Sequence, residues 1–290
     1  MECLQFEIPP TPQFMTVGHG TWAPGQRHFE RNFQVYDMLF VITGALYMGE
    51  EGREYSILPG QLLILEAGKT HVGTRPCEEH TEIYWVHFIH AEPAEHVDSQ
   101  HIAWDSVIPR DTDESTTPTR QFMYLPKYAY IDIRPLLPIL NGMVSLHADF
   151  TLQRSMELHA RVMQLFMELQ IQVAASQQPT QSRKISEQAQ AFLRDTHLQP
   201  FSSEALEREL KYNVDYITRC MKKHTGMSPV KYLHYLRIED AKQRLIHTDA
   251  PLPLLAEQTG FPDYNYFIRL FRQHTGTTPG QYRRIRRGQV

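Results

Sequence analysis

Part of this sequence is written twice near its C-terminal end. Residues 216–232 and 266–282 follow one pattern, so that Tyr216 aligns with Tyr266 and Tyr232 with Tyr282, an offset of 50. Seven of the seventeen positions are identical. Similar stretches must form similar local structure, so an internal repeat limits the fold before any other feature does. Two copies are too few for a solenoid, and we expect two related modules joined by a spacer.

Each copy carries the same helix stop and start signals. Gly226 and Gly276 follow amphipathic runs and suit the left-handed residue that ends a helix. Ser228 and Thr278 are each followed by proline, which predicts a hydroxyl N-cap with proline at the first helical position.

A shorter helix is predicted before each amphipathic run, over 203–210 and 253–259. The second helices are predicted over 214–224 and 264–274, which gives two helix-turn-helix arrangements. The spacer 229–247 has apolar residues at helical spacing and nineteen residues, about 28 Å of helix. Successive major-groove faces of DNA lie about 34 Å apart. The spacer can therefore set two recognition helices into neighbouring turns of one duplex.

Three motifs give these modules a family resemblance. They are Thr-Gly-x-Ser/Thr-Pro-x-x-Tyr after each second helix, Leu-Arg-Ile-Glu-Asp-Ala at 236–241, and Leu-Ala-Glu-Gln-Thr-Gly-Phe at 255–261. Together they resemble the AraC/XylS family of bacterial transcription regulators, over residues 184–287. The resemblance implies a sequence-specific regulator of double-stranded DNA that needs no cofactor. RNA polymerase is a further partner if the protein is an activator, the more expected output.

The first copy departs from the family pattern at two positions. Glu207 stands where the second copy has Ala256, and Lys211 stands where it has Gly260. A residue other than glycine in a left-handed turn costs about 1 kcal/mol. The turn of the first copy is therefore expected to carry strain, and its docking on DNA is less well defined by the resemblance.

The resemblance also indicates which residues face DNA. Positions that match the family's base-reading sites are Asp215, Thr218 and Arg219 in the first copy, and Tyr264, Asn265, Ile268 and Arg269 in the second. Arginine pairs with guanine, asparagine with adenine, and isoleucine meets the thymine methyl group. Phosphate contacts or solvated charges are expected at Lys222, Lys223, Arg272, Arg283, Arg284, Arg286 and Arg287.

Other interpretations stay open for some of these residues. Asp215 can accept from cytosine, cap its helix, or avoid the phosphates. Arg219 and Arg269 can be plain exposed helix arginines, but their recurrence at equal phase in both copies favours a contact.

Charge is distributed unevenly along the chain, whose net charge is −4. Residues 184–290 contain seventeen Lys and Arg against eleven Asp and Glu, a net +6, whereas residues 1–183 carry −10. A basic C-terminal module on an acidic body confines the electrostatic footprint for nucleic acid to one end.

Cysteines and hydropathy indicate the compartment. The three cysteines are Cys3, Cys77 and Cys220, an odd and scattered set that predicts neither a disulfide nor a zinc framework. No stretch approaches the roughly 18 uninterrupted apolar residues of a membrane span. Glu2 and Glu7 make the N-terminus acidic, unlike a signal peptide. We expect a cytoplasmic protein without a membrane partner.

Residues 1–98 are expected to form short strands separated by glycine-containing turns. The strands are predicted over 33–42, 45–48, 53–58, 61–65 and 81–89. This order suggests a small sandwich or barrel and resembles the cupin-type sensor domain of many family members. The expected fold class is α+β, with an N-terminal cupin-like β-barrel, a helical dimerisation segment, and a C-terminal all-α domain with two helix-turn-helix motifs.

The inward face of such a barrel is where a small polar ligand would bind. Candidate effector contacts are Arg31, Tyr36, His71, Trp85 and His87. The alternative is that the histidines only pack or line the rim and that the aromatic rings belong to the core. The layout Tyr36-x-x-Leu-Phe-Val…Tyr84-Trp-x-x-Phe88 resembles sugar-responsive family members, which implies a sugar as effector.

Two competing functions remain open. Catalytic cupins carry a His-x-His…Glu…His metal set, and this chain has no His-x-His, so we predict no catalytic residue and no metal site. A cupin enzyme fused to a DNA-binding module nevertheless stays an alternative. The other is a ligand-independent DNA-binding protein whose barrel only supports dimerisation.

Between barrel and DNA module, residues 99–130 are expected to be irregular, with a loop over 111–118, and helices are predicted over 134–147 and 153–175. The second helix has an apolar stripe at helical spacing that predicts burial, either against the barrel or in a homodimer seam. The stripe comprises Met156, His159, Val162, Met163, Phe166, Leu169 and Val173. The expected domains are a sensing barrel (1–98), a loop and helical dimerisation segment (99–175), a flexible linker (176–183) and the DNA-binding domain (184–290).

Overall fold

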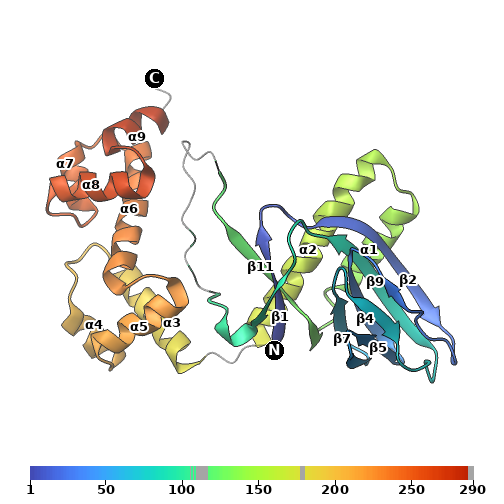
Figure 1. The fold of residues 1–290 in the computed structure, drawn as a ribbon. Helices are drawn as coiled ribbons and strands as arrows, with labels where there is room; N and C mark the ends of the chain where they lie inside the picture. Colours follow the sequence, from blue (N-terminus) through green and yellow to red (C-terminus); the bar gives the residue numbers. More distant parts are fainter. Residues whose placement is uncertain (105, 107, 109–116, 177–179, 287–290) are drawn as a thin grey trace. The chain divides into compact units, whose positions relative to one another are not determined.

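The computed structural model describes residues 1–104, 106, 108, 117–176 and 180–286. The chain divides into two compact units (Figure 1). The first, here called the β unit, comprises Met1–Ile102 and Arg120–Gln178. The second, here called the helical unit, comprises Pro179–Val290 together with Ala103–Thr119. Most of the predicted loop 111–118, residues 177–179 of the predicted linker, and Arg287 lie outside the described residues.

The β unit is built from three antiparallel sheets. The central sheet has five strands in the order β12 (Tyr128–Tyr130), β7 (Gln61–Leu65), β4 (Tyr36–Thr43), β9 (Thr81–Ile89) and β2 (Gln13–Trp22). A second sheet has the order β3 (Arg31–Asn32), β8 (Thr70–Gly73), β5 (Leu46–Glu50) and β6 (Arg53–Ile57). The third has the order β10 (Glu95–Asp98), β1 (Glu2–Ile8) and β11 (Gln121–Pro126).

The central sheet is apolar on both faces. Successive side chains of a strand point to opposite faces, so Met38 and Phe40 of β4 join one core and Leu39 and Val41 join another. The first core continues into β1, β11 and two helices, and the second fills the space toward the four-stranded sheet. A strand buried on both faces has a continuous apolar sequence, which is why a strand was predicted over 33–42, where the structure has β4 at 36–43.

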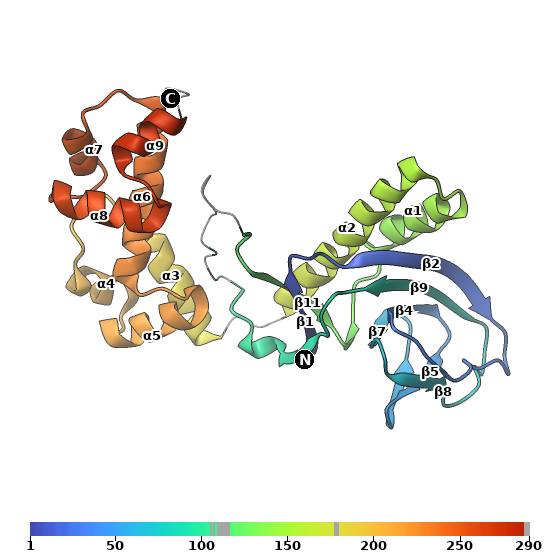
Figure 2. The same ribbon diagram turned by 45° about the horizontal axis from the view of Figure 1, so that its top comes forward.

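Two helices cover one face of the central sheet, α1 (Leu137–Ala148) and α2 (Leu152–Ser176), as Figure 2 shows. Of the predicted stripe, Val162, Phe166 and Leu169 are buried in that core, and Val173 is also buried. Packing on the β unit is therefore confirmed for the three core residues. Met156 differs, since it is 74% exposed on the outer side of α2.

Several strands differ from the prediction. β7 and β9 have their predicted bounds, but β11 and β12 lie in the stretch 99–130 that was expected to be irregular, so that expectation was wrong there. β2 was missed because Gly18 and Gly20 weaken a strand pattern. Both glycines face the ring of Trp85, and a Cβ on Gly18 would lie 2.0 Å from it. Among the described residues the sheets form separate ladders, so the cupin-like barrel is not closed.

The helical unit contains the two predicted helix-turn-helix pairs. Its helices are α3 (Gln181–Asp195), α4 (Ser203–Leu210), α5 (Val214–Thr225), α6 (Pro229–His247), α7 (Leu252–Gln258), α8 (Tyr264–Thr275) and α9 (Pro279–Arg286). The pair α4–α5 packs with α3 in one core, and the pair α7–α8 packs with α9 in another. α6 contributes residues to both cores, with the bounds predicted for the spacer.

The repeat extends to the buried residues. Ile217 and Met221 of α5 are buried, and Phe267 and Phe271 of α8 are buried at the same offset of 50. Both helices end in a left-handed glycine, Gly226 at φ 72° and Gly276 at φ 79°. Ser228 caps α6 by accepting from the Lys231 N–H, as predicted, and Thr278 accepts from the Gln281 N–H at the start of α9.

The departures in the first copy are structurally explained. Lys211 ends α4 in the left-handed region at φ 60°, as Gly260 does in the second copy at φ 83°. Glu207 fixes the turn because its carboxylate accepts from the Val214 N–H at 2.7 Å. The strain expected at Lys211 is present, and a contact that Ala256 cannot make accompanies it.

Replacing Lys211 by glycine should relieve this strain. We expect Lys211→Gly to raise the free energy of unfolding of the helical unit by up to about 1 kcal/mol. Lys211→Ala is the matched control, since it removes the side chain but keeps the left-handed penalty. Urea denaturation followed by far-ultraviolet circular dichroism measures both, and equal effects of the two variants would contradict the strain argument.

Candidate nucleic-acid interface and ligand pocket

The residues predicted to read DNA lie on the exposed faces of α5 and α8. In α5, Asp215 and Arg219 are exposed and Thr218 is half-buried; in α8, Asn265 and Arg269 are exposed. In each helix the four positions have the spacing i, i+3, i+4 and i+7; they are 215, 218, 219 and 222 in α5, and 265, 268, 269 and 272 in α8. Such positions share one helix face. The two faces are therefore built alike.

The repeat also includes a side-chain contact on this face. The Arg219 guanidinium carbon lies 5.6 Å from the ring centroid of Tyr216, and that of Arg269 lies 5.3 Å from the ring of Tyr266. Cation–π contacts of this kind limit the rotamers of a long side chain. The side chains of both arginines are therefore restrained in the same way on their helices.

The N-terminal ends of both helices are capped by residues outside the predicted set. Asn213 accepts from the Tyr216 N–H at 2.8 Å, and Asp263 accepts from the N–H groups of Asn265 and Tyr266 at 2.8 and 3.0 Å. Asp215 is not the N-cap, so the capping alternative for it was wrong. Its exposed carboxylate remains free to face a base or the solvent.

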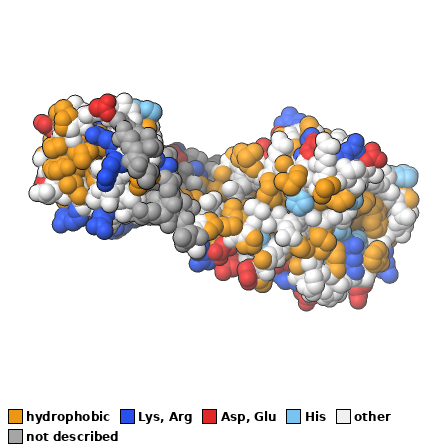
Figure 3. Space-filling view, turned by 90° about the horizontal axis from the view of Figure 1, so that it is seen from above, with side chains coloured by type: hydrophobic (Ala, Val, Ile, Leu, Met, Phe, Trp, Pro, Cys, Tyr) orange, Lys and Arg blue, Asp and Glu red, His pale blue; other side chains and the backbone are white. Residues whose placement is uncertain are grey.

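Basic side chains supply the remaining charge of this surface. Lys222, Lys223 and Arg272 are exposed in the last turns of α5 and α8. Figure 3 shows groups of Lys and Arg side chains on the helical unit, at the left of the view. Such charges suit the phosphates, which fix position but carry no sequence information.

Arg237 of α6 joins the two halves of the helical unit. Its guanidinium donates to the carbonyls of His197 at 2.6 Å and Gln199 at 2.5 Å, in the connection between α3 and α4. The same group lies 5.7 Å from the ring of Phe261, in the turn of the second motif. A Cβ on Gly260 would come within 2.7 Å of Arg237 Nε. The turn glycine therefore makes room for a buried arginine.

The β unit holds a small cavity of about 240 Å³ between its two larger sheets. It brings together three of the predicted effector residues, Arg31, Trp85 and His87, with other side chains that the sequence did not single out. Those are Trp22, His28, Phe29, Asp37, Leu39 and Ile83. His71 adjoins it through its hydrogen bond with Arg31.

Asp37 is the charged centre of this pocket, and it is fully buried. Its Oδ2 accepts from Arg31 Nη2 at 2.7 Å, and its Oδ1 lies 3.3 Å from His87 Nε2. Arg31 Nε also donates to His71 Nε2 at 3.0 Å. The β3–β8 register, which places Arg31 opposite His71, and the β4–β9 register, which places Asp37 opposite His87, bring these four together.

The electrostatics keep two of the histidines neutral. Burial, and next the positive charge of Arg31, lower the pKa of His71 to about 4. Burial also lowers the pKa of His28, whose Nδ1 donates to the Phe29 carbonyl at 2.7 Å. At neutral pH the imidazole rings of His28 and His71 beside the Arg31–Asp37 pair are therefore neutral.

His28, Asp37 and His71 have ligand atoms within 4.8 Å of one another, a group that is able to hold a metal ion. The prediction of no metal site came from sequence spacing and overlooked this grouping. Arg31 already donates to the carboxylate of Asp37 and to a ring nitrogen of His71, which are two of these three possible ligands. Its positive charge occupies the place that a cation would take and opposes metal binding.

Tyr36 does not belong to this pocket, contrary to its prediction as an effector contact. Strand alternation turns it to the helix-covered face, where it packs on Phe6 and Phe88 and accepts from the Ala94 N–H at 2.8 Å. Asp37, one residue later, takes the inward position. The sequence signal was a carboxylate inside an apolar run, Val35-Tyr-Asp-Met-Leu, which marks a buried charge that needs a partner.

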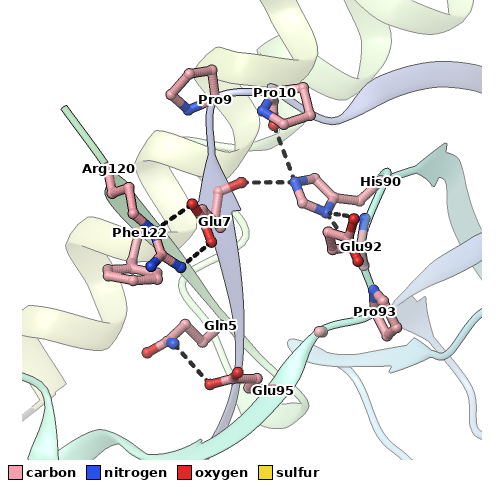
Figure 4. Close-up of a pocket in the computed structure, with 11 residues that line it drawn as sticks. Gln5, Glu7, Pro9, Pro10, His90, Glu92, Pro93, Glu95, Arg120 and Phe122 are labelled. Carbon is pink, nitrogen blue, oxygen red and sulfur yellow. Dashed lines mark hydrogen bonds and ion pairs between the residues drawn. The ribbon is translucent and has the colours of Figure 1, made fainter. Parts of the chain in front are cut away.

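A second hollow of about 790 Å³ lies beside β1 (Figure 4). Arg120 forms a bidentate ion pair with Glu7 and holds the pKa of that carboxyl below its usual value. His90 lies 2.8 and 3.0 Å from the carbonyls of Glu7 and Pro10 through Nε2, and 2.8 Å from the Glu92 carbonyl through Nδ1. The polar groups of this hollow are bonded to one another, and the contacts of His90 connect β1 to the loop after β9.

The fold and exposed faces of the helical unit define a class of protein, a DNA-binding regulator with two helix-turn-helix motifs. Residues 206–285 match the family model described as a helix-turn-helix domain. A relative named as an uncharacterized HTH-type transcriptional regulator, YisR of Bacillus subtilis, is 29% identical over 98% of both chains. The chain is therefore similar to HTH-type transcriptional regulators, and its residues 206–285 carry the helix-turn-helix domain.

Two further similar proteins match about a third of the chain, and a third one matches most of it at low identity. The HTH-type transcriptional activator RhaS of Escherichia fergusonii is 36% identical over 34% of this chain and 34% of its own length. The C-terminal domain of the response regulator YesN from Fusobacterium nucleatum is 33% identical over 34% of this chain and 98% of that chain, with a TM-score of 0.33. ToxT from Vibrio cholerae is 11% identical over 93% of this chain and 95% of that chain, also at 0.33. TM-scores this low support no conclusion about ligand or assembly.

None of the described helices combines the length and the apolar character that a bilayer crossing requires.

Removing the Arg237 guanidinium should destabilise the helical unit. Arg237→Met removes the charged donor of the two partly buried hydrogen bonds to the carbonyls of His197 and Gln199, and a hydrogen bond to a charged group contributes about 1.5–3 kcal/mol. We expect the free energy of unfolding to fall by about 2–4 kcal/mol in urea denaturation. Lys231→Met, at an exposed position of α6, is the control and should change it little; equal losses would show that Arg237 acts only as surface charge.

Proposed function

We propose that this protein is an effector-responsive, homodimeric activator of transcription in the cytoplasm, which binds promoter DNA with both helix-turn-helix motifs and contacts RNA polymerase there. The observation that carries the DNA-binding part is the repeated exposed face, with the same four positions on α5 and α8 and the same arginine–tyrosine contact. Two faces built on the same pattern, one on each side of a connecting helix, suit two successive turns of a duplex.

The direct base contacts are assigned to the exposed faces. Arg219 and Arg269 pair with guanine, Asn265 with adenine, and Ile268 meets a thymine methyl group. Asp215, Thr218 and Tyr264 line the same grooves, and the phosphates are bound by Lys222, Lys223 and Arg272. α6 has nineteen residues and is about 28 Å long, close to the roughly 34 Å between major-groove faces.

The effector site is assigned to the cavity of the β unit, with Arg31, His71, Trp85 and His87 as contacts. A sugar is the effector class that the family resemblance implies. An effector acts only if it binds one arrangement of the protein more tightly than another. Buried polar atoms without a hydrogen-bond partner among the described residues, Asp37 Oδ1 and His87 Nε2, support a ligand at this place.

The homodimer contact is assigned to the outer face of α2. Met156, Met167 and Ile171 are 74%, 56% and 51% exposed, and Ala160 is exposed between them. These four positions lie within about 60° of one another on a helical wheel, opposite the buried stripe. An apolar stripe of this kind on a 25-residue helix suits a second copy of α2.

Substitutions on the two faces should separate base from phosphate contacts. With an operator selected in vitro by the wild-type protein, Arg269→Ala should cost about 1–3 kcal/mol and relax preference at one base pair. Lys222→Ala should weaken all sequences alike and reduce the slope of log affinity against log salt by about 1. Fluorescence anisotropy over a salt series measures both. Lys242→Ala, an equal charge loss on α6, is the control, and equal effects of all three would contradict these assignments.

A charge in the outer stripe of α2 should separate the subunits. Met167→Glu places a carboxylate in the centre of the proposed contact and should raise the dimer dissociation constant at least tenfold in sedimentation velocity. Ser145→Glu adds the same charge at an exposed position of α1, outside the stripe, and should leave the constant unchanged. A monomeric wild-type protein at micromolar concentration would refute the dimer itself.

A further inference from the structure

The Arg31 guanidinium is held along one of its edges. Nε donates to His71 Nε2 at 3.0 Å, and Nη2 donates to Asp37 Oδ2 at 2.7 Å. Both acceptors belong to side chains that are only 1% exposed. These two donors form the same side of the planar group, so the guanidinium has one orientation, set by the interior of the β unit.

Two aromatic rings lie close to the guanidinium. Its central carbon lies 4.2 Å from the ring centroid of Phe33 and 5.6 Å from that of Phe29. With Nε and one N–H of Nη2 engaged, the end formed by Nη1 and the second N–H of Nη2 is left. Within the described parts of the chain, no acceptor is hydrogen-bonded to Nη1, and the side chain is 26% exposed.

The cavity that Arg31 lines is small and largely apolar. Its volume is about 240 Å³, below the usual ~300–1,000 Å³ of ligand pockets. Trp22, Trp85, Leu39 and Ile83 supply most of its wall, and Phe29 stands at the rim with 66% of its surface exposed. A ligand that fills it is small and presents a compact body to the rings.

The free end of a fixed guanidinium selects a carboxylate over a hydroxyl group. Its two parallel N–H bonds match the two oxygens of a carboxylate, and such charge-assisted bonds are about twice as strong as neutral ones. A sugar hydroxyl offers one acceptor and no charge. Asp37 opposes an anion, but it lies on the far edge of the guanidinium, with His87 Nε2 3.3 Å from its second oxygen.

We propose that the effector of this protein is a small carboxylic acid whose carboxylate is bound by the outer end of Arg31. The proposal rests on the effector role of this cavity and narrows its ligand from sugars in general to acids. Two sources share this chemistry, sugar acids such as a uronate, and acids with an apolar or aromatic body. Trp22 and Trp85 accommodate either, by stacking on a sugar ring or on an aryl group.

The test is thermal unfolding of the full-length protein with matched ligand pairs. Galacturonate is compared with galactose, and benzoate with benzyl alcohol, each with and without a chelator. We expect one acid to raise the melting temperature by several degrees and its neutral partner to leave it unchanged. A galacturonate shift identifies the sugar-acid source, and a benzoate shift the apolar one.

Variants connect the shift to Arg31. Arg31→Gln removes the charge and should abolish the acid-dependent shift. Arg31→Lys keeps the charge beside Asp37 and guards against misfolding, and it should weaken acid binding at least tenfold, because lysine lacks the paired donors. Arg120→Gln is the matched control, an arginine of the same unit paired with Glu7 outside the cavity, and it should retain the full shift.

The outcomes separate this proposal from the proposed function. A neutral sugar that shifts the melting temperature as much as its acid, and also changes DNA affinity, would overturn the carboxylate and leave the regulator intact. A shift produced by Zn²⁺ or Ni²⁺ alone and removed by chelator would overturn it in favour of the His28, Asp37 and His71 set. No shift with either acid, with unchanged DNA binding, would overturn both the carboxylate and the effector role of the cavity.

Discussion

The β unit depends on the burial of one carboxylate, Asp37, in the middle of its central sheet. A buried charge without a partner costs several kcal/mol, so the surrounding chain must supply a cation and hydrogen bonds. Arg31 does so, and it is held in turn by His71 across the β3–β8 ladder. The other residues at the centre of β4 pack in two apolar cores, so Asp37 is the charged residue that this strand places in the pocket.

The helical unit follows a different principle, the repetition of one packing scheme. Each recognition helix buries residues at the same offset and leaves the same face exposed, so the sequence pattern specifies a surface as well as a core. α6 holds these two surfaces at a set distance because residues of it belong to both cores. Arg237 adds hydrogen bonds and a ring contact that tie the first half to the turn of the second.

These two designs suggest how one chain combines the proposed effector site with its DNA-binding faces. In the β unit, polar groups are concentrated in a cavity whose charge balance a ligand would alter. In the helical unit, charges are spread over an exposed face where phosphates would lie. A dimer contact along the outer face of α2 would hold two such chains together, since the inner face of that helix is already occupied by the sheet core.

Sequence alone determined the helical unit, including the bounds of α4 and α6, the left-handed turn at Lys211 and the exposed faces of α5 and α8. Those features follow from local rules of capping and helical period within short stretches. It determined the pocket only in part. Arg31, Trp85 and His87 were identified, but Tyr36 was placed there wrongly, and Asp37 and His28 were missed. Strand register and face decide which distant side chains meet, and a one-residue step reverses the face. That choice is made by the packing of the whole sheet, so only the tertiary structure could show it.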